Sequence, residues 1–537
     1  MTLAGNRGLA EVEAVATRSG RIAAAGSRSE VDALVGPSTR RLELAPDELA
    51  MPGMTDSHLH LADASIAVGE VDLSLALDLA AGLRVLAEAH GRLPPGAWLT
   101  GHGWSSDHSG GWPTADDLVR VAPGRKVALW AHDHHALWVS AEALADAGVG
   151  PSSDDPSGGA IRRLADGRPS GVLHESATGL VTSRIPIPTL AMYEAALPAI
   201  CRELVALGVV AVHDPGVLGR DPWLEGPLVA YANLAEAGRL PLQVHASIRA
   251  EGLAAALERG LRSGDGLGID PSRRARFGWL KLFADGSLGS RTAAMLEPFE
   301  PIGDEAPASG GQPNPLDKGI WVTEPAVLAA RTAQAAAGGI ATQIHGIGDA
   351  AVRAALDAFE PEATRGLPLR ARIEHAQLVD PVDLERFGRL GIVASIQPVH
   401  LRGDAAQARA SWGPRAERSS YAWGSLLRHG ATLAFGTDAP VESIDPWPGL
   451  AMAIDRRWAG WPGDVTAFGP SEALSLDEAL RGACLGPAQA EGSVDRGRLV
   501  AGQRADVVVI PARFPDSILA STQPRLVLID GVVAYEA

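Results

Sequence analysis

The feature that most constrains the fold of this chain is a regular alternation of strand-length apolar runs with Ala- and Leu-rich helical segments. From about residue 192 onward, seven such runs end at 212–214, 244–245, 280–283, 343–345, 372–375, 394–397 and 434–438. An eighth run leads into His58-Leu59-His60. Eight strands that alternate with helices are the count of a (β/α)8 barrel. The sequence therefore predicts an α/β protein with a TIM barrel at its centre.

The two ends of the chain differ from the barrel region. Short runs that alternate apolar and polar residues between glycines are typical of β-hairpins, and they occur near both termini. Because chain ends often lie close together, we expect residues 1–52 and 497–537 to form one discontinuous, small β-sandwich domain. The barrel would comprise residues 53–62 and 192–496. Residues 63–191, which do not alternate cleanly, would be an α+β insertion after strand one that covers the barrel as a lid.

The net charge of the chain restricts the classes of molecule that we expect this protein to bind. The 537 residues carry a formal net charge of −17, whereas nucleic acids and anionic membranes bind basic surfaces. We expect no signal peptide and no membrane span, and two cysteines cannot form a disulfide framework. These features predict a cytoplasmic protein that binds neither nucleic acid nor membrane. No Walker or Rossmann glycine pattern follows a strand, so no nucleotide cofactor is expected.

Six residues of the types that bind metals or transfer protons fall at or near predicted strand ends. They are His58, His60, Lys281, His345, His375 and Asp438. Active sites of (β/α)8 barrels lie at the carboxyl ends of the strands, so these side chains are expected to converge. Two histidines two positions apart on a strand, such as His58 and His60, share a face and begin a transition-metal site. The alternatives are a chance histidine pair, a lysine that extends to the surface and an aspartate that only caps a helix.

Longer motifs around these residues resemble a known family. Residues 281–293 read KLFADGSLGSRTA, residues 345–352 read HGIGDAAV, residues 372–377 read RIEHAQ and residues 499–510 read LVAGQRADVVVI. In this order the motifs resemble the amidohydrolase superfamily, which comprises barrel hydrolases with one or two bound metal ions. The chain looks most like the amidohydrolase-3, or YtcJ-like, family. The resemblance covers nearly the whole chain.

The resemblance implies two divalent metal ions per chain. The implied ligands are His58, His60 and Asp438 for one ion and His345 and His375 for the other. Lys281 would bridge the two ions after its amine reacts with CO2 to give a carbamate. Glu175, which the insertion contributes, is the alternative bridging ligand. Zinc is the first expectation, although sites of histidine and carboxylate also accept Mn, Fe, Co or Ni.

The implied reaction is hydrolysis of a C–N bond other than a peptide bond, in an amide, formamide, carbamate or cyclic amide of a small molecule. A bound metal lowers the pKa of its water from about 15.7 to about 7, which supplies a hydroxide nucleophile at neutral pH. Asp438 is the candidate catalytic residue, because it could orient this water and move its proton to the leaving nitrogen. A heterocycle deaminase on the same barrel is the second hypothesis, although Lys281 argues against it. A metal-free scaffold or binding protein is the third.

Four further residues are candidates for substrate contacts: His135, Ser290, Arg291 and His400. His135 lies in the insertion, in a segment that resembles the family's Asp-Gly-His motif. Ser290 and Arg291 closely follow Lys281, and His400 lies near the end of the seventh strand. We expect a homodimer only because homodimers are the commonest assemblies of soluble proteins.

Overall fold

Eight parallel strands form the central sheet of the computed structural model. The structure describes residues 12–537 except 68, 77, 106–110, 218–225, 270–272, 302–316, 464 and 512–519. In sheet order the strands are β4 (Met54–Asp56), β11 (Val209–Asp214), β12 (Gln243–Arg249), β13 (Ala275–Phe283), β14 (Thr342–Gly346), β15 (Arg372–His375), β16 (Val393–Ile396) and β17 (Thr432–Phe435). The backbone N–H of Ser57 donates to the carbonyl of Phe435 at 2.8 Å and so links the two outer strands. The predicted eight-stranded barrel is confirmed.

The barrel strands are buried on both faces, which explains why they read as continuous apolar runs. All the residues of β11 and β12 are buried. The helices that cover the barrel are α2 (Leu61–Ala67), α7 (Leu190–Ala206), α8 (Pro227–Glu236), α9 (Leu253–Glu258), α10 (Pro325–Ala337), α11 (Asp349–Ala358), α12 (Leu384–Leu390), α13 (Leu401–Trp412), α14 (Pro414–Ser419), α15 (Trp423–Arg428), α16 (Trp447–Asp455), α17 (Leu476–Leu480) and α18 (Gly486–Ala490). Their buried apolar side chains join those of the strands in one large core.

Both ends of the chain contribute strands to one antiparallel sheet. Its order is β20 (Val532–Glu536), β19 (Leu526–Ile529), β18 (Val507–Pro511) and β3 (Glu48–Pro52). A hairpin of β1 (Ala14–Arg18) and β2 (Arg21–Gly26) precedes the short helix α1 (Arg28–Asp32). Ile22 of the hairpin packs with Leu499, Ala505 and Val507 in a small separate core. The hairpin and the sheet are therefore held together by apolar burial.

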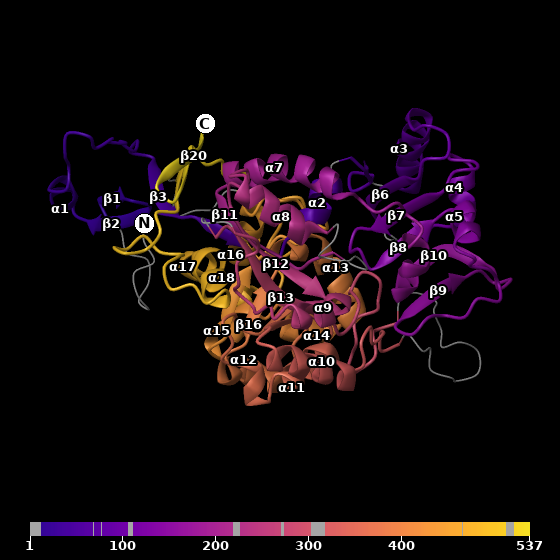
Figure 1. Cartoon of the computed structure of the whole chain (residues 1–537). Helices are drawn as coiled ribbons and strands as arrows, with labels where there is room; N and C mark the ends of the chain where they lie inside the picture. Colours follow the sequence, from indigo (N-terminus) through magenta and orange to yellow (C-terminus); the bar gives the residue numbers. More distant parts are fainter. Residues whose placement is uncertain are drawn as a thin grey trace.

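A second sheet lies between β4 and α7 in the sequence. Its order is β5 (Val71–Asp72), β6 (Leu99–Trp104), β7 (Val127–Ala131), β8 (Ala136–Val139), β10 (Pro169–Glu175) and β9 (Gly159–Arg163). Four helices accompany it: α3 (Leu79–Arg92), α4 (Ala115–Val119), α5 (Ala141–Asp146) and α6 (Gly179–Thr182). Figure 1 shows this sheet on one side of the barrel and the strands of the chain ends on the other. Within the described residues, no helix is long and apolar enough to cross a membrane.

Candidate metal centre

The predicted ligands His58, His60 and Asp438 lie just beyond strand ends, not within strands. β4 ends at Asp56 and β17 ends at Phe435, so the expectation that His58 and His60 share a face of a strand is wrong. The two segments instead continue side by side past the sheet. The carbonyl of His58 accepts the N–H of Asp438 at 2.7 Å, and the N–H of His60 donates to the carbonyl of Ala439 at 2.9 Å.

The carboxylate of Asp56 fixes this pair of segments. It accepts hydrogen bonds from the N–H of His58 at 3.1 Å and from the hydroxyl of Thr437 at 2.7 Å. Burial raises the pKa of Asp56 to about 6, and these hydrogen bonds oppose the increase. A Cβ atom at Gly436 would lie 2.6 Å from the backbone nitrogen of His58. Glycine at this position therefore permits the close approach that brings the ligands together.

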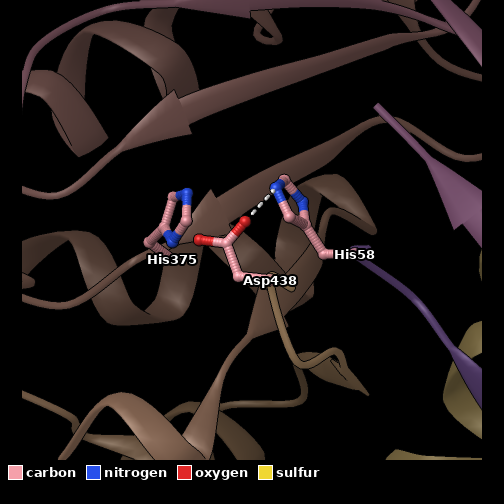
Figure 2. Close-up of side chains that lie close together, drawn as sticks. All are labelled: His58, His375 and Asp438. Carbon is pink, nitrogen blue, oxygen red and sulfur yellow. Dashed lines mark ion pairs between the residues drawn. The ribbon is translucent and has the colours of Figure 1, made fainter. Parts of the chain in front are cut away.

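Asp438 lies at the centre of the predicted ligand set. Its Oδ1 atom is 3.3 Å from Nε2 of His58 and 3.3 Å from Nε2 of His60. Figure 2 shows the carboxylate of Asp438 between the imidazoles of His58 and His375. The ring centroids of His58 and His375 are 5.2 Å apart. The backbone φ angles of Asp438 (61°) and His375 (69°) lie in the left-handed region, a strain that is often stored at functional sites.

The donor atoms of this cluster fit a transition-metal ion. Among the described residues, the buried atoms Oδ1 of Asp438 and Nδ1 of His375 have no hydrogen-bond partner, and orphaned buried polar atoms are rare in folded proteins. Burial holds the pKa of His375 well below its usual range, so its imidazole is neutral, as a ligand must be. Burial raises the pKa of Asp438, but His58 and His400 outweigh this effect and hold it well below its usual range. A neutral imidazole and a carboxylate suit a borderline divalent metal such as zinc.

Lys281 is buried within the barrel. It lies in β13, only 1% of it is exposed, and its Nζ atom is 4.8 Å from the centroid of the Phe283 ring. The alternative of a lysine that extends to the surface is therefore excluded. Burial lowers the pKa of Lys281 to about 7, although the carboxylates of Glu374 and Asp438 oppose the decrease. An amine with a pKa near 7 is uncharged in a substantial fraction of molecules at neutral pH, whereas an ordinary lysine is almost always charged.

His345 reaches the same cluster from β14. Its ring centroid is 4.5 Å from that of His375. Its Nε2 atom donates to the carbonyl of Gly286 at 2.9 Å, which leaves Nδ1 with the lone pair. Burial holds the pKa of His345 well below its usual range, so this imidazole is also neutral. Asp285, 3.6 Å from Nε2 of His345, accepts the N–H groups of Ile347 and Gly348 at 3.1 and 2.8 Å.

Glu374 is not among the residues predicted from the sequence, although it belongs to the RIEHAQ motif. Nδ1 of His58 donates to Oε2 of Glu374 at 2.5 Å, and Nε of Arg372 lies 2.6 Å from Oε1. Glu374 is fully buried, and burial raises its pKa, but Arg372 and His58 outweigh this effect and hold it well below its usual range. The signal in the sequence was a carboxylate within an apolar strand, one residue before a predicted ligand.

His400, predicted from the sequence as a substrate contact, lies beside Asp438. Its Nε2 atom is 3.2 Å from Oδ2 of Asp438, and its Nδ1 atom is 3.6 Å from Oε1 of Glu442. Glu442 is also paired with His132 of the insertion at 3.5 Å and with Arg402 at 2.6 Å. Burial lowers the pKa of His400, but the two carboxylates outweigh it and raise the pKa to about 10. His400 therefore carries a positive charge beside Asp438 at neutral pH.

The insertion places His135 and Glu175 near His345. Nδ1 of His135 is 2.9 Å from Oε2 of Glu175, and the ring of His135 lies 5.0 Å from that of His345. Burial lowers the pKa of His135, but Glu175 and other carboxylates raise it to about 9. The other oxygen of Glu175 accepts the hydroxyl of Thr292 at 2.5 Å. Both oxygens of the alternative bridging ligand are thus engaged by these neighbours.

Ser290 and Arg291 form contacts with protein groups. The hydroxyl of Ser290 donates to Asp133 of the insertion at 2.8 Å. The guanidinium of Arg291 donates to the hydroxyl of Ser411 at 3.3 Å and to the carbonyl of Glu300 at 2.9 Å. Ser290 thus joins the loop after β13 to the insertion, and its role as a substrate contact stays a prediction, as does that of Arg291.

A second buried cluster, formed by His213 of β11, His245 of β12 and Glu491 just after α18, is explained by contacts within the protein. His213 and His245 each lie 3.2 Å from Oε2 of Glu491. Nη1 of Arg372 lies 2.9 Å from Nδ1 of His213. Because arginine only donates, Nδ1 of His213 is an acceptor and its Nε2 atom carries the proton that faces Glu491. A protonated ring nitrogen cannot bind a metal, so this cluster differs from that around Asp438.

Comparisons with known proteins agree with the geometry. The model of the Amidohydrolase family matches residues 45–535. The protein YtcJ of Bacillus subtilis is 28% identical over 543 residues, which cover 98% of this chain and 96% of YtcJ. The N-substituted formamide deformylase of Arthrobacter pascens is 27% identical, with 98% and 95% of the two chains covered. The structure of a metal-dependent hydrolase from Pyrococcus horikoshii superposes with a TM-score of 0.71 at 26% identity, covering 97% of this chain and 95% of that chain.

Proposed function

The chain belongs to the amidohydrolase family, as its motifs indicated, and on this premise we propose that it hydrolyses a C–N bond, other than a peptide bond, of a small molecule. The observation that carries the proposal is the position of Asp438, whose Oδ1 atom lies 3.3 Å from Nε2 of both His58 and His60. This arrangement places two nitrogens that can bind a metal beside a carboxylate that can accept a proton.

The residues that would hold the metal ions are those predicted from the sequence: His58, His60, Lys281, His345, His375 and Asp438. When bound, divalent ions polarise a carbonyl oxygen and lower the pKa of water. Two cations need anionic ligands, and the carboxylate of Asp438 supplies one of them. Glu374 and the carbonyl of Gly286 would orient His58 and His345, because a hydrogen bond on one ring nitrogen fixes the other as the metal ligand.

Lys281 would supply the second anion as a carbamate. In this step the lone pair of the uncharged amine would form a bond to the carbon of CO2, one C=O π bond would open to give an anionic oxygen, and the proton lost from the nitrogen would pass to water. The burial of Lys281 supports the step, because burial favours the uncharged amine. A carbamate offers two oxygens on one carbon, so it can contact both ions, whereas an amine has one lone pair.

Asp438 would carry the proton transfers of the reaction. A carboxylate near the attacked carbonyl can accept a proton from water and pass it to the nitrogen that leaves. His400 would position Asp438, since it holds Oδ2 at 3.2 Å and leaves Oδ1 free of hydrogen bonds. Its positive charge, which Glu442 helps to maintain, keeps the Asp438 carboxylate ionised before it accepts the proton.

N-substituted formamides are the first substrate class to test. The A. pascens relative, which is aligned over 98% of this chain, is named for that activity. A formyl group is also small enough to approach ligands that lie under the insertion, where His135 and Glu175 face His345. Amides, carbamates and cyclic amides of similar size form the comparison set.

The decisive experiment is the metal content of the purified protein by mass spectrometry, with and without added bicarbonate. We expect about two ions per chain in the wild type, as in two-metal hydrolases, and fewer in Lys281→Ala. Lys126→Ala, which removes a half-buried lysine of the insertion paired with Asp146 at 2.6 Å, is the matched control. One ion per chain in both proteins would exclude Lys281 as a bridge and favour the deaminase hypothesis. No metal after loading would refute the proposed function.

A further inference from the structure

A cavity of about 600 Å³ lies at the opposite end of the barrel from the candidate metal centre. It is lined by Gln243 and His245 at the start of β12 and by Arg276 at the start of β13. The turn between β1 and β2 and the segment 491–496 after α18 complete its wall. In Figure 1, α18 and the β1–β2 hairpin lie on the side of the molecule where the strands of the chain ends are. The amino-terminal ends of barrel strands usually serve stability, so a cavity of this size there requires another explanation.

The lining of the cavity is rich in arginine. Its charged residues are the arginines Arg21, Arg273, Arg276, Arg496 and Arg504 and the carboxylates Glu491, Asp495 and Asp530. The lining therefore has more cations than anions, whereas the whole chain carries a net charge of −17. Like charges that are gathered in this way repel one another unless an anion lies between them.

Each carboxylate of the lining is already paired with an arginine. Arg21 lies 2.9 Å from Asp495, and Arg504 lies 2.8 Å from Asp530. Glu491 lies 3.5 Å from Arg496, accepts a hydrogen bond from His213 and lies 3.2 Å from Nδ1 of His245. The carboxylates that line the cavity are thus already engaged by neighbouring side chains of the protein.

Arg273 and Arg276 are the unmatched cations. Among the described residues, neither forms an ion pair with a carboxylate, and Arg276 donates only to the backbone carbonyls of Gly264 at 3.2 Å and Arg273 at 3.3 Å. Burial, followed by repulsion from Arg273, lowers the pKa of Arg276, although the more distant carboxylate of Glu491 opposes the decrease. Neither arginine has a described carboxylate within ion-pair distance, so an anionic ligand in the cavity would have two guanidinium groups available to it.

We propose that this cavity binds a small dianion through a phosphate group, carried by the free ion or by a phosphate monoester. The planar fork of each guanidinium matches the oxygens of a phosphate group. A phosphate concentrates on one centre the two negative charges that Arg273 and Arg276 lack. The volume lies within the range of about 300–1,000 Å³ typical of small-molecule sites, so the rest of a monoester also fits. The proposal is independent of the reaction at the metal centre.

The test is calorimetric titration of the metal-loaded, full-length protein with inorganic phosphate and with glycerol phosphate. We expect saturable binding with a Kd below about 1 mM. Arg276→Gln should weaken binding at least fivefold, and its loss of charge leaves no carboxylate unpaired. Asp495→Asn should strengthen binding, because it removes a competing anion and frees Arg21. Misfolding would weaken phosphate binding in both variants, so it cannot explain affinities that change in opposite directions.

Two controls make the result specific. Arg418→Gln, which removes an exposed arginine of α14 outside the cavity, should leave the affinity unchanged. Binding should also persist after removal of the metal by a chelator, whereas phosphate held at the metal centre would be lost. Tighter binding of glycerol phosphate assigns the site to monoesters, and tighter binding of phosphate assigns it to the free ion. No saturable heat with either probe, or equal affinities in wild type and Arg276→Gln, would overturn the proposal.

Discussion

Nδ1 of His58 and Oε2 of Glu374 are 2.5 Å apart, so a carboxylate holds one ring nitrogen of a predicted metal ligand while the other ring nitrogen faces Asp438. Glu374 is in turn paired with the buried Arg372. This chain of contacts fixes the tautomer and the orientation of His58, as carboxylate–histidine pairs do in metal sites. The prediction is that metal affinity depends on a residue that does not touch the metal.

Glu374→Gln should lower the affinity for the metal ion that His58 would bind about 10- to 100-fold. The amide keeps the shape of the side chain but loses the charge that orients His58. Competition with a chromogenic chelator measures the affinity. Glu472→Gln, which alters a buried glutamate that is bonded to Ser425 and Arg428, is the control and should bind metal as the wild type does. Equal affinities in the two variants would show that Glu374 only balances the charge of Arg372.

The contact between the insertion and the barrel leads to a prediction about local opening. Asp133 accepts the hydroxyls of Ser287 at 2.6 Å and Ser290 at 2.8 Å. Asp133→Ala leaves both hydroxyls without this acceptor, at a cost of about 1–3 kcal/mol. Hydrogen exchange should become faster at residues 131–135 and 286–292, and KM should rise more than kcat falls. Asp146→Ala, which breaks the ion pair with Lys126 elsewhere in the insertion, should change neither quantity. Unchanged exchange in Asp133→Ala would argue that apolar packing alone holds the insertion.

The stability of the sheet formed by both chain ends should depend on pH through the carboxylate of Glu48. Its carboxylate binds Arg525 through two contacts, at 2.5 and 3.0 Å, and these lower its pKa from an ordinary value of 4.5. A lowered pKa in the folded state stabilises the fold above the unfolded pKa, and this contribution is lost as the pH falls through the folded pKa. Glu48→Gln should therefore destabilise the protein by about 1 kcal/mol at pH 7 and by less below pH 4.5.

Thermal unfolding of both proteins between pH 7 and acid pH measures this effect. The exposed pair of Arg28 and Glu43, 2.8 Å apart, provides the control, since exposed ion pairs contribute little. Glu43→Gln should unfold as the wild type does at every pH. A difference between wild type and Glu48→Gln that stays constant as the pH falls would contradict the linkage.

The barrel was predictable from the sequence because its strands are buried on both faces. Continuous apolar runs mark such strands, and all eight runs became strands of the central sheet. Strand ends were less predictable. Asp438 lies three positions after the last residue of β17, in a segment held by hydrogen bonds to the carboxylate of Asp56 and by backbone hydrogen bonds to residues 58–60 beyond the sheet. Apolar periodicity carries no information about such bonds.

Residues that act through other residues were harder to predict than ligands. Glu374 is a single acid in an apolar strand, and only the fold shows that it faces both His58 and Arg372. Ser290 is close to Lys281 in sequence, yet its hydroxyl is directed to Asp133 of the insertion. The arginine cavity gives no signal at all, because its residues come from distant parts of the chain with no common spacing.

Asp438→Asn should lower kcat about 10²- to 10⁴-fold, the usual contribution of a general acid–base group. Asparagine keeps the shape and can still accept the N–H of a positioned histidine, but it cannot take a proton from water. His400→Gln should have a smaller effect, because it acts on Asp438 only through the contact at 3.2 Å. Initial rates with an N-substituted formamide, on enzyme of measured metal content, separate lost catalysis from lost metal. Asp455→Asn, in an exposed position at the end of α16, is the control. An Asp438→Asn enzyme that retains its metal and the rate of this control would assign proton transfer to another group, and His135, whose ring lies 5.0 Å from that of His345, would be tested next.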